Sequence, residues 1–497
     1  MINTLFIDAL AASFELENND VYYTAEYEVY LNGNYYSRFN KNVFSLYGLK
    51  PNTTYRVHLR SNEIEEEFSF STLDKKCVVY DGASNLQEAI DVLKPNEVLV
   101  IDGVYEIISL FLRNNTTIYL TKNAKLIGEK DRYKFPILKA DEYLNDKPLG
   151  TWEGRADDSF SSIITGLGVS NAVIYGEGII DCEAQKTDWW VDHRTMRGAR
   201  RPKGIFLHTC RNVTLMGITV CNTPSWNQHP FYCQNISYID IRLTNPANSP
   251  TTDGIDPESC DDVKIIGAII SVGDDCIAVK SGKIDFAKKY QTPSSNIIIR
   301  NCLMLDGHGG VTLGSENSGG INNLKVSKCV FKSTDRGLRI KTQRTRGNLA
   351  VIENVSFNNI IMNDVKAPFV INSFYKAGND VIDYRFDRGY REFDDETPIL
   401  RSFCFEEIKC IDTSFGLGYF LGLPESKIEN VTLKNIEVSY KADAKPGVMA
   451  MTKENEQFLK IGIYASNVKC LILDNVKYVN EPLDDMILDN VDKVVVE

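Results

Sequence analysis

Residues 212–217 read Asn-Val-Thr-Leu-Met-Gly, and residues 235–240 read Asn-Ile-Ser-Tyr-Ile-Asp. In both stretches a polar residue precedes an alternating apolar run that stops at a turn residue. Related stretches begin at Asn171, Asp262, Asn296, Asn323, Asn354, Asn430 and Asn467, and the intervals between successive copies from Asn212 to Asn354 are 23, 27, 34, 27 and 31 residues. A recurrence of roughly 20–50 residues is typical of a solenoid in which each repeat forms one coil.

The apolar residues inside each repeat predict strands rather than helices. They alternate with polar residues over about five to seven positions, and no repeat keeps a 3.6-residue apolar period. We therefore predict an all-β fold, a right-handed parallel β-helix whose coils stack at roughly 4.8 Å. The recurring asparagines suit the turns, because their side chains bond to nearby backbone groups and tolerate left-handed conformations. A β-sandwich would not keep one register over about ten repeats.

Residues 1–75 lack this repeat and are predicted to form a separate domain. Within them, residues 49–57 read Leu-Lys-Pro-Asn-Thr-Thr-Tyr-Arg-Val. This run resembles the Leu-x-Pro-x-Thr-x-Tyr-x-Val sequence of fibronectin type III domains, small β-sandwiches in which the tyrosine anchors a strand at a corner. The β-helix is predicted for residues 76–497, and helical spacing over residues 85–93 indicates a helix that caps its open end.

Length and composition agree with a soluble solenoid. The chain has 497 residues, of which 43% are hydrophobic and 25% charged, and a solenoid reaches this length by adding coils. No apolar stretch approaches the roughly 18 residues of a membrane helix, so no membrane partner is expected. A net charge of −12 repels polyanions at long range, so nucleic acid is not expected as a partner and an acidic substrate would need local positive groups.

The cysteines and the N-terminus indicate a cellular compartment. The twelve cysteines are scattered without a Cys-x-x-Cys pair, which favours buried free thiols over disulfides or metal ligands. Residues 1–8, Met-Ile-Asn-Thr-Leu-Phe-Ile-Asp, lack the basic residues of a secretory signal. We therefore expect a cytoplasmic protein, or a secreted one if a signal peptide has been removed. Neither a cofactor nor a bound metal is expected.

Four polar clusters recur at intervals close to the repeat. They are Thr252-Asp253, Gly273-Asp274-Asp275, Gly307-His308-Gly309 and Arg339-Ile340-Lys341. Because coils stack in register, the clusters should share one face of the helix. Asp256, Asp261 and Asp262, which lie near the first cluster, are predicted to be structural turn residues.

The shared face predicts acid–base chemistry. Carboxylates as close as Asp253, Asp274 and Asp275 cannot all ionise easily, so one should keep its proton near neutral pH. A carboxylic acid beside carboxylates can protonate the leaving oxygen of a glycosidic bond while a base activates water. His308 could hold or recharge the acid, and the charges of Arg339 and Lys341 suit a carboxylate on the substrate.

The clusters also resemble a known family. Thr-Asp-Gly-Ile-Asp (252–256), Gly-Asp-Asp-Cys-Ile-Ala (273–278), Gly-His-Gly (307–309) and Arg-Ile-Lys (339–341) are similar, in order, to the four signature motifs of the polygalacturonases of glycoside hydrolase family 28. The resemblance implies hydrolysis of α-1,4-linked galacturonate, in polygalacturonate or oligogalacturonides, with inversion. At the position before Thr252-Asp253, where the family usually has Asn, this chain has Thr251.

The same resemblance implies a role for each residue. Asp274 corresponds to the general acid, Asp253 and Asp275 to the groups that activate water, and His308 to the residue that supports the acid. Arg339 and Lys341 correspond to residues that bind the substrate carboxylate. Residues 368–375 resemble the strand that carries a substrate-contacting tyrosine, which adds Tyr375.

Stereochemistry is implied by the resemblance alone. One coil separates Asp253 from Asp275 by roughly 5 Å, and the general rule for paired carboxylates would assign that separation to retention.

Insertions between the repeats predict action at chain ends. Segments 140–165, 181–203 and 376–403 are long enough to close one end of the groove, and exopolygalacturonases of the family resemble this chain in such loops and, in some members, an N-terminal fibronectin-like domain. This suggests trimming of oligogalacturonides imported into a bacterial cell. Residues 193–203 concentrate positive charge, so Arg201 and Lys203 are expected to bind a terminal galacturonate, and Trp189-Trp190 could stack on a sugar ring.

Other functions remain open at this point. Rhamnogalacturonan or xylogalacturonan hydrolysis is the alternative within the family. A pectate lyase would use acidic residues to bind Ca²⁺ and a basic residue as the base. A β-helix that binds glycans without cleaving them, and assembly into a homo-oligomer, also remain open.

Overall fold

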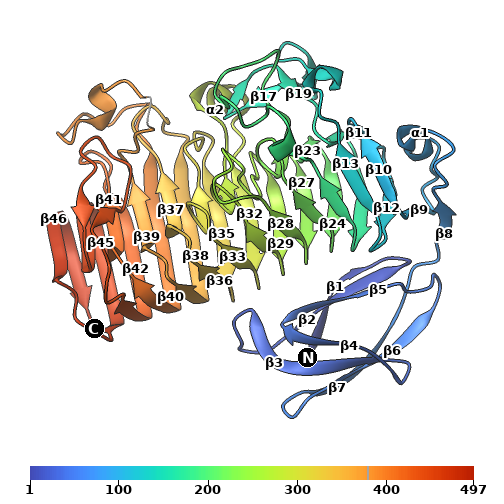
Figure 1. Cartoon of the computed structure of the whole chain (residues 1–497). Helices are drawn as coiled ribbons and strands as arrows, with labels where there is room; N and C mark the ends of the chain where they lie inside the picture. The colour runs from blue at the N-terminus through green and yellow to red at the C-terminus, as the bar shows by residue number, and fades with distance from the viewer. Residues whose placement is uncertain (378–379) are drawn as a thin grey trace.

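The computed structural model describes residues 1–377 and 380–497, and it consists of a long stack of β-coils with a small β-domain against one side (Figure 1). Parallel pairing runs from β8 (Lys76–Val79) to β46 (Asp484–Val496). The two α-helices of the described residues are short: α1 (Leu86–Asp91) and α2 (Ile284–Tyr290). The predicted all-β fold with a parallel β-helix is confirmed. No helix in the described parts is long and apolar enough to span a membrane.

Strands at equivalent positions of successive coils pair in parallel and form long columns. The first column follows β9 (Glu97–Ile101) with β12 (Thr117–Leu120), β21 (Val173–Gly176), β24 (Arg211–Met216), β27 (Gln234–Ile239), β29 (Asp261–Ile266), β32 (Ser294–Arg300), β35 (Ile321–Ser327), β38 (Val351–Asn363), β40 (Ile399–Thr413), β42 (Ile428–Tyr440) and β45 (Ile461–Tyr478). The second comprises β10 (Val104–Ile107), β13 (Lys125–Gly128), β22 (Ile179–Asp181), β25 (Thr219–Cys221), β28 (Arg242–Thr244), β30 (Ile269–Ser271), β33 (Leu303–Leu305) and β36 (Val330–Lys332) before it joins β38.

The third column carries the four polar clusters. Its early strands are β11 (Leu110–Phe111), β20 (Ile164–Leu167), β23 (Ile205–His208) and β26 (Gln228–Phe231). Its later strands are β31 (Ile277–Val279), β34 (Val311–Leu313), β37 (Arg336–Lys341), β39 (Ala367–Asn372) and β41 (Gly416–Leu421). Ile255 joins the two runs, because it pairs with Gln228 on one side and with Ile277 on the other.

The apolar residues of the columns fill the interior, and asparagines lie in the turns next to the strands. Asn171, Asn212, Asn235, Asn296, Asn323 and Asn354 all have left-handed backbone conformations. Their side chains form a ladder from coil to coil: the Asn212 amide donates to Asn171 at 3.0 Å, and the Asn235 amide donates to Asn212 at 2.9 Å. This is the turn role expected for the recurring Asn.

The N-terminal strands form two antiparallel sheets. One contains β1 (Ile2–Ile7), β2 (Ala11–Leu16) and β5 (Val43–Tyr47), and the other contains β4 (Asn34–Lys41), β3 (Tyr23–Leu31), β6 (Thr54–Arg60) and β7 (Glu65–Ser71). Phe14 and Phe44 are buried between them. The hydroxyl of Tyr55 accepts a hydrogen bond from the Lys50 amide at 2.9 Å, which is the contact of a tyrosine corner.

Short hairpins project from the side of the β-helix opposite the N-terminal domain (Figure 1). Their paired strands are β14 (Ile137–Leu138) with β19 (Ser159–Phe160), β15 (Tyr143–Leu144) with β16 (Lys147–Pro148), and β17 (Thr151–Trp152) with β18 (Arg155–Ala156). A further hairpin, β43 (Gly447–Val448) with β44 (Gln457–Phe458), follows β42. These hairpins surround the face that carries the third column.

Candidate active site

The register of the third column places the predicted acidic residues in successive coils. Ile255 pairs with Ile277, so Asp253 and Asp275 occupy the same position in adjacent coils, two residues before the paired residue. Ile277 pairs with Val311, so His308 lies one coil beyond Asp274 at the equivalent position. Stacked coils therefore bring together residues that are 20 to 35 positions apart in the sequence, as the spacing predicts.

The three carboxylates form one compact cluster. Oxygens of Asp253, Asp274 and Asp275 all lie within 4.8 Å of one another. Asp253 and Asp275 are buried, and Asp274 is partly exposed. All three line a cavity of about 180 Å³ together with Trp226, Lys280, Glu316, Lys341 and Tyr375, so Tyr375 borders the same space as the carboxylates.

Basic side chains hold Asp275 in its charged form. Lys341 Nζ lies 2.6 Å from Asp275 Oδ2, and Arg339 Nη1 lies 3.3 Å from Asp275 Oδ1. Burial alone would raise the pKa of Asp275, but the charges of Lys341 and Arg339 outweigh it and hold the pKa well below its usual range. Lys341 lines the cavity and Arg339 is not among the residues that line it, but both contact the carboxylate of Asp275.

The pKa of Asp253 is shifted in the opposite direction to that of Asp275. Burial, followed by the nearby carboxylates of Asp256 and Asp274, raises its pKa well above the usual range. Lys280 opposes this shift only in part, since its Nζ lies 3.3 Å from Asp253 and 2.6 Å from Asp256. The cluster therefore pairs one carboxylate held ionised with one that favours its proton, which is the arrangement needed for combined acid and base work.

Asp256 and Lys280 were not predicted as site residues. Asp256 was predicted to be a turn residue, yet it is fully buried, and burial raises its pKa to about 6. Lys280 lies over the ring of Trp226 at 4.6 Å. Ile277 pairs with Val311, and Val311 pairs with Leu338 in the next coil. Lys280 lies three residues after Ile277 and Lys341 three residues after Leu338, so the two lysines occupy equivalent positions, which is a signal that the sequence offered for Lys280.

The carboxylate cluster has the donors of a cation site, but its charge is already balanced. Three basic side chains, from Lys280, Arg339 and Lys341, lie within 3.3 Å of Asp253, Asp256 or Asp275. A divalent cation at the same oxygens would face these charges at close range. The residues present therefore fit hydrolytic acid–base chemistry better than a Ca²⁺ site.

His308 is positioned from both sides. Its backbone amide donates to the Asp274 carbonyl at 3.0 Å, and its Nδ1 lies 3.0 Å from Asp335 Oδ2. The hydrogen bond to Asp335 is the largest of the effects that raise the pKa of His308. Asp335 also pairs with Lys366 at 2.6 Å. Sequence reasoning did not identify Asp335, which stands one residue before β37 without a motif of its own.

The two residues of the basic segment that were predicted to bind a chain end, Arg201 and Lys203, lie in different surroundings. Arg201 lines a second cavity beside the catalytic one. Lys203 does not line either cavity; it is 1% exposed, and its Nζ donates to the Thr151 carbonyl at 2.9 Å. Burial lowers the pKa of Lys203 to about 7. Contact between Lys203 and a substrate was expected, but the hairpin formed by β17 and β18 covers its side chain.

One member of the tryptophan pair, Trp189, does not offer the predicted sugar surface. Trp189 is 1% exposed and packs against Phe135 and Phe160, with the guanidinium of Arg132 at 4.2 Å from its ring. Trp190 donates its indole N–H to the Thr223 carbonyl at 3.1 Å. The prediction for Trp189 is wrong, because its ring fixes the inserted loop to the helix.

A parallel β-helix that presents clustered carboxylates and basic groups on one column defines a class of carbohydrate-active proteins. The model of the family described as Glycosyl hydrolases family 28 matches residues 138–454. The chain belongs to this family.

Relatives and solved structures agree with that assignment. A probable polygalacturonase of Vitis vinifera is 28% identical over 345 residues, which are 68% of this chain and 65% of the relative. An endo-polygalacturonase of Pectobacterium carotovorum subsp. carotovorum is 31% identical over 46% of this chain and 57% of its own. The chain thus spans about half to two thirds of the length of these relatives. The family 28 exopolygalacturonase of Yersinia enterocolitica shares the fold with a TM-score of 0.71 at 18% identity, over 99% of this chain and 98% of that one.

Proposed function

We propose that this protein is a polygalacturonase that hydrolyses α-1,4 linkages between galacturonate units. The observation that carries the proposal is the cluster of Asp253, Asp274 and Asp275 within 4.8 Å, bordered by Lys341 and Arg339. The carboxylates supply the acid and the base of glycosidic cleavage, and the basic groups favour an acidic sugar. Relatives named polygalacturonases support the same substrate class.

The charges around the carboxylates support different roles for them, one as a base and another as an acid. Asp275, held ionised, is suited to take a proton from the attacking water. Asp274 is the most exposed of the three carboxyls that line the cavity, and its oxygens lie within 4.8 Å of those of Asp253, which favours the proton. In this proposal Asp274 delivers a proton to the leaving oxygen while Asp275 takes one from the attacking water, and the proton on Asp275 passes back to the pair of Asp253 and Asp274 before the next turnover. Inversion remains the stereochemical outcome that the family resemblance implies.

Action at a chain end is part of the proposal. The hairpin of β17 and β18 reaches the far side of the catalytic cavity, because the Gly154 carbonyl accepts a hydrogen bond from the Lys283 amide at 3.0 Å. A strand of polymer could not pass straight through a groove that is bridged in this way. This contact supports exo-action. The twelve unpaired cysteines support a reducing, cytoplasmic location for the enzyme.

Product analysis tests the function. The purified protein is incubated with polygalacturonate and with galacturonate oligomers of defined length, and products are followed over time. We expect new reducing ends without ultraviolet-absorbing unsaturated products, no loss of activity with a chelator, and mono- or digalacturonate from the first time points. The Asp274→Asn variant should lose at least roughly a hundredfold in kcat. Unsaturated products that depend on Ca²⁺ would instead identify a lyase, and an unaffected Asp274→Asn variant would refute the assigned site.

A further inference from the structure

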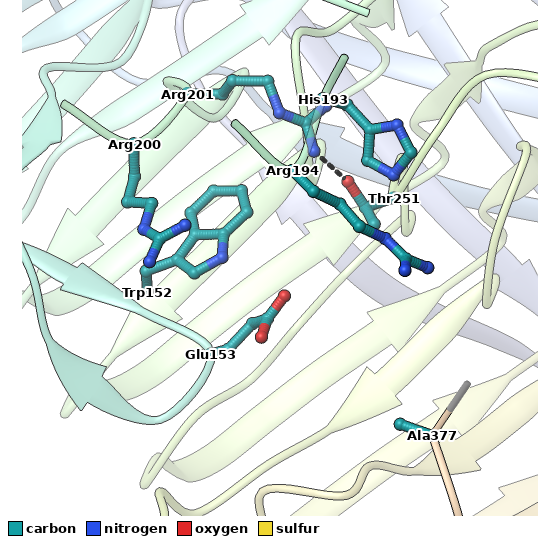
Figure 2. Close-up of a pocket in the computed structure, with 8 residues that line it drawn as sticks. All are labelled: Trp152, Glu153, His193, Arg194, Arg200, Arg201, Thr251 and Ala377. Carbon is teal, nitrogen blue, oxygen red and sulfur yellow. Dashed lines mark hydrogen bonds between the residues drawn. The ribbon is translucent and has the colours of Figure 1, made fainter. Parts of the chain in front are cut away.

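A second cavity of about 320 Å³ adjoins the catalytic one (Figure 2). Glu153, Thr251 and Ala377 line both cavities, so the two are direct neighbours. The second cavity is otherwise lined by Trp152, His193, Arg194, Arg200 and Arg201. The catalytic cavity alone, about 180 Å³, is smaller than the roughly 300–1,000 Å³ typical of ligand sites, whereas the two together reach that range.

Arg201 is a buried cation that forms no ion pair within 4.0 Å with the residues that the structure describes, although Glu153 and Asp253 attract it from further away. It is 5% exposed, and no described carboxylate lies within 4.0 Å of it. Its guanidinium donates to the carbonyls of Pro224 and Pro250 and to the hydroxyl of Thr251, while its Nε has no partner. Burial lowers its pKa to about 10. An uncompensated buried charge is costly, so its retention points to a ligand that supplies the opposite charge.

The surroundings of Arg201 are basic as well. Arg194 is exposed at the mouth of the cavity and makes no ion pair with any described residue. Burial together with the charges of Arg201 and Arg194 lowers the pKa of His193. Arg200 is less available, because it pairs with Asp157 at 2.7 Å. Glu153 is the one carboxylate of the lining, and it stands at the passage into the catalytic cavity rather than beside the guanidinium of Arg201 (Figure 2).

Thr251 connects the two cavities chemically. It is two residues before Asp253, it has a left-handed backbone conformation, and its hydroxyl accepts the hydrogen bond from Arg201. This is the position at which the chain departs from the Asn usual in the family motif. In this chain the hydroxyl of Thr251, in place of the usual Asn side chain, is the acceptor that orients Arg201.

We propose that the second cavity binds the carboxylate of a neighbouring uronate unit of the same substrate chain, with Arg201 and Arg194 as its charged contacts. This inference rests on the proposed function and deepens it: the enzyme would recognise two acidic sugars, one in each cavity. Arg201 suits the task because a guanidinium binds a carboxylate through two parallel hydrogen bonds. Neutral or methyl-esterified units at this position would leave the charge of Arg201 unpaired.

Substitutions on the basic segment test the proposal. Arg194→Gln removes an exposed charge, and Arg201→Gln removes the buried one. Arg197→Gln is the matched control, because Arg197 lies on the same segment but pairs with Asp188 and Asp192 and does not line the cavity. The substrates are galacturonate oligomers of defined length with all carboxylates free, and the same oligomers methyl-esterified at the terminal unit distant from the reducing end.

For the unmodified enzyme we expect esterification to lower kcat/KM by roughly tenfold to a hundredfold, since a charge-assisted hydrogen bond is lost. Arg194→Gln should raise KM for the free acid by about tenfold with little change in kcat, and should reduce the discrimination against the ester to about threefold or less. Arg197→Gln should behave as the unmodified enzyme. Unchanged KM and unchanged discrimination in Arg194→Gln would overturn the proposal even if Arg201→Gln failed to fold.

A binding measurement separates failure of this proposal from failure of the proposed function. Trigalacturonate is titrated into the Asp274→Asn protein, with and without the additional Arg194→Gln substitution. The titration measures the affinity of the cavity for the ligand in the absence of turnover. Weaker binding in the double variant supports the subsite whether or not hydrolysis of galacturonate is observed. Equal binding overturns the subsite and leaves the hydrolase assignment to be judged by the product analysis.

Discussion

Glu258 shows how burial decides the charge of a residue beneath the active-site face. It pairs in register with Lys280 of the next coil, and its Oε2 lies 2.9 Å from His229 Nε2. Burial raises the pKa of Glu258 to about 8 and lowers the pKa of His229 well below its usual value. At neutral pH the contact is therefore a carboxylic acid that donates to a neutral imidazole, and it is not an ion pair.

This protonation state predicts a dependence of stability on pH. The unfolded chain releases the Glu258 proton near its ordinary pKa of 4.5, whereas the folded protein keeps it until about pH 8. Between these values the unfolded state binds fewer protons, so the contribution of Glu258 to stability falls as pH rises. The other charged groups that face it are Lys203, Lys280, Asp256 and Glu316.

Glu258→Gln should therefore change how the free energy of unfolding varies with pH. The variant keeps a neutral side chain at all pH values, so its stability relative to the unmodified protein should improve on the order of 3 kcal/mol between about pH 5 and about pH 8. Denaturant unfolding of both proteins at the two pH values measures the difference. If the difference between them is the same at both values, Glu258 titrates normally in the fold.

Among structural elements, the hairpin of β17 and β18 controls access to the site. Glu153 and Gly154 form its two-residue tip, both with left-handed backbone conformations, as such tight hairpins require. A Cβ atom on Gly154 would meet the Lys283 amide nitrogen at 2.8 Å and Glu316 Cγ at 2.9 Å. The tip is therefore packed against the opposite wall of the catalytic cavity.

Gly154→Val should release this tip. The variant combines an unfavourable left-handed conformation with a clash against Lys283 and Glu316, so the hairpin should withdraw from the far wall. We expect KM for short galacturonate oligomers to rise about tenfold and longer products to appear among the early ones, measured by chromatography of timed digests.

The N-terminal domain offers a matched control for that experiment. Gly33 occupies the same position of a two-residue hairpin after Asn32, also at positive φ, but an added Cβ would meet nothing within 4 Å. Gly33→Val should cost similar backbone strain without changing the products. A Gly154→Val enzyme with the unmodified product pattern would show that the hairpin tip does not restrict the groove.

At the scale of the whole molecule, buried polar contacts fix the N-terminal domain to the β-helix. Arg300 on β32 binds both carboxylate oxygens of Glu15, at 2.7 and 2.8 Å, and the Asn301 amide donates to the same carboxylate at 2.6 Å. Asn42 donates to the Asn301 side chain at 3.0 Å. These contacts lie on the side of the helix opposite the hairpins that surround the site (Figure 1).

Breaking this junction should affect stability and leave catalysis unchanged. Glu15→Gln leaves Arg300 without its carboxylate in a mostly buried place, and should lower the free energy of unfolding by about 1–3 kcal/mol. Glu26→Gln is the control, because Glu26 pairs with Arg38 in an exposed position and should cost less than about 1 kcal/mol. Thermal unfolding and kcat at 25 °C are the measurements. A fall in kcat for Glu15→Gln would mean that the junction reaches the active site.

The sequence by itself determined the coils and the residues that recur with them. A repeat near 30 residues with alternating apolar positions has one good solution, parallel coils in register, and that register alone brings Asp253, Asp274, Asp275 and His308 to one face. The motif that includes Arg339 and Lys341 follows from the same rule. Periodic positions are predictable because each coil repeats the geometry of the one before.

Only the tertiary structure decided what the insertions do. Lys203 and Trp189 were assigned to the substrate on residue type, but a loop without a repeat has no register, and packing turned both side chains into the protein. Packing also left Arg201 facing a cavity with its charge unbalanced. Long-range contacts alone determine which charged side chains of a loop are buried and which are paired. The proposed binding of a second acidic sugar by Arg201 therefore depends on the tertiary structure.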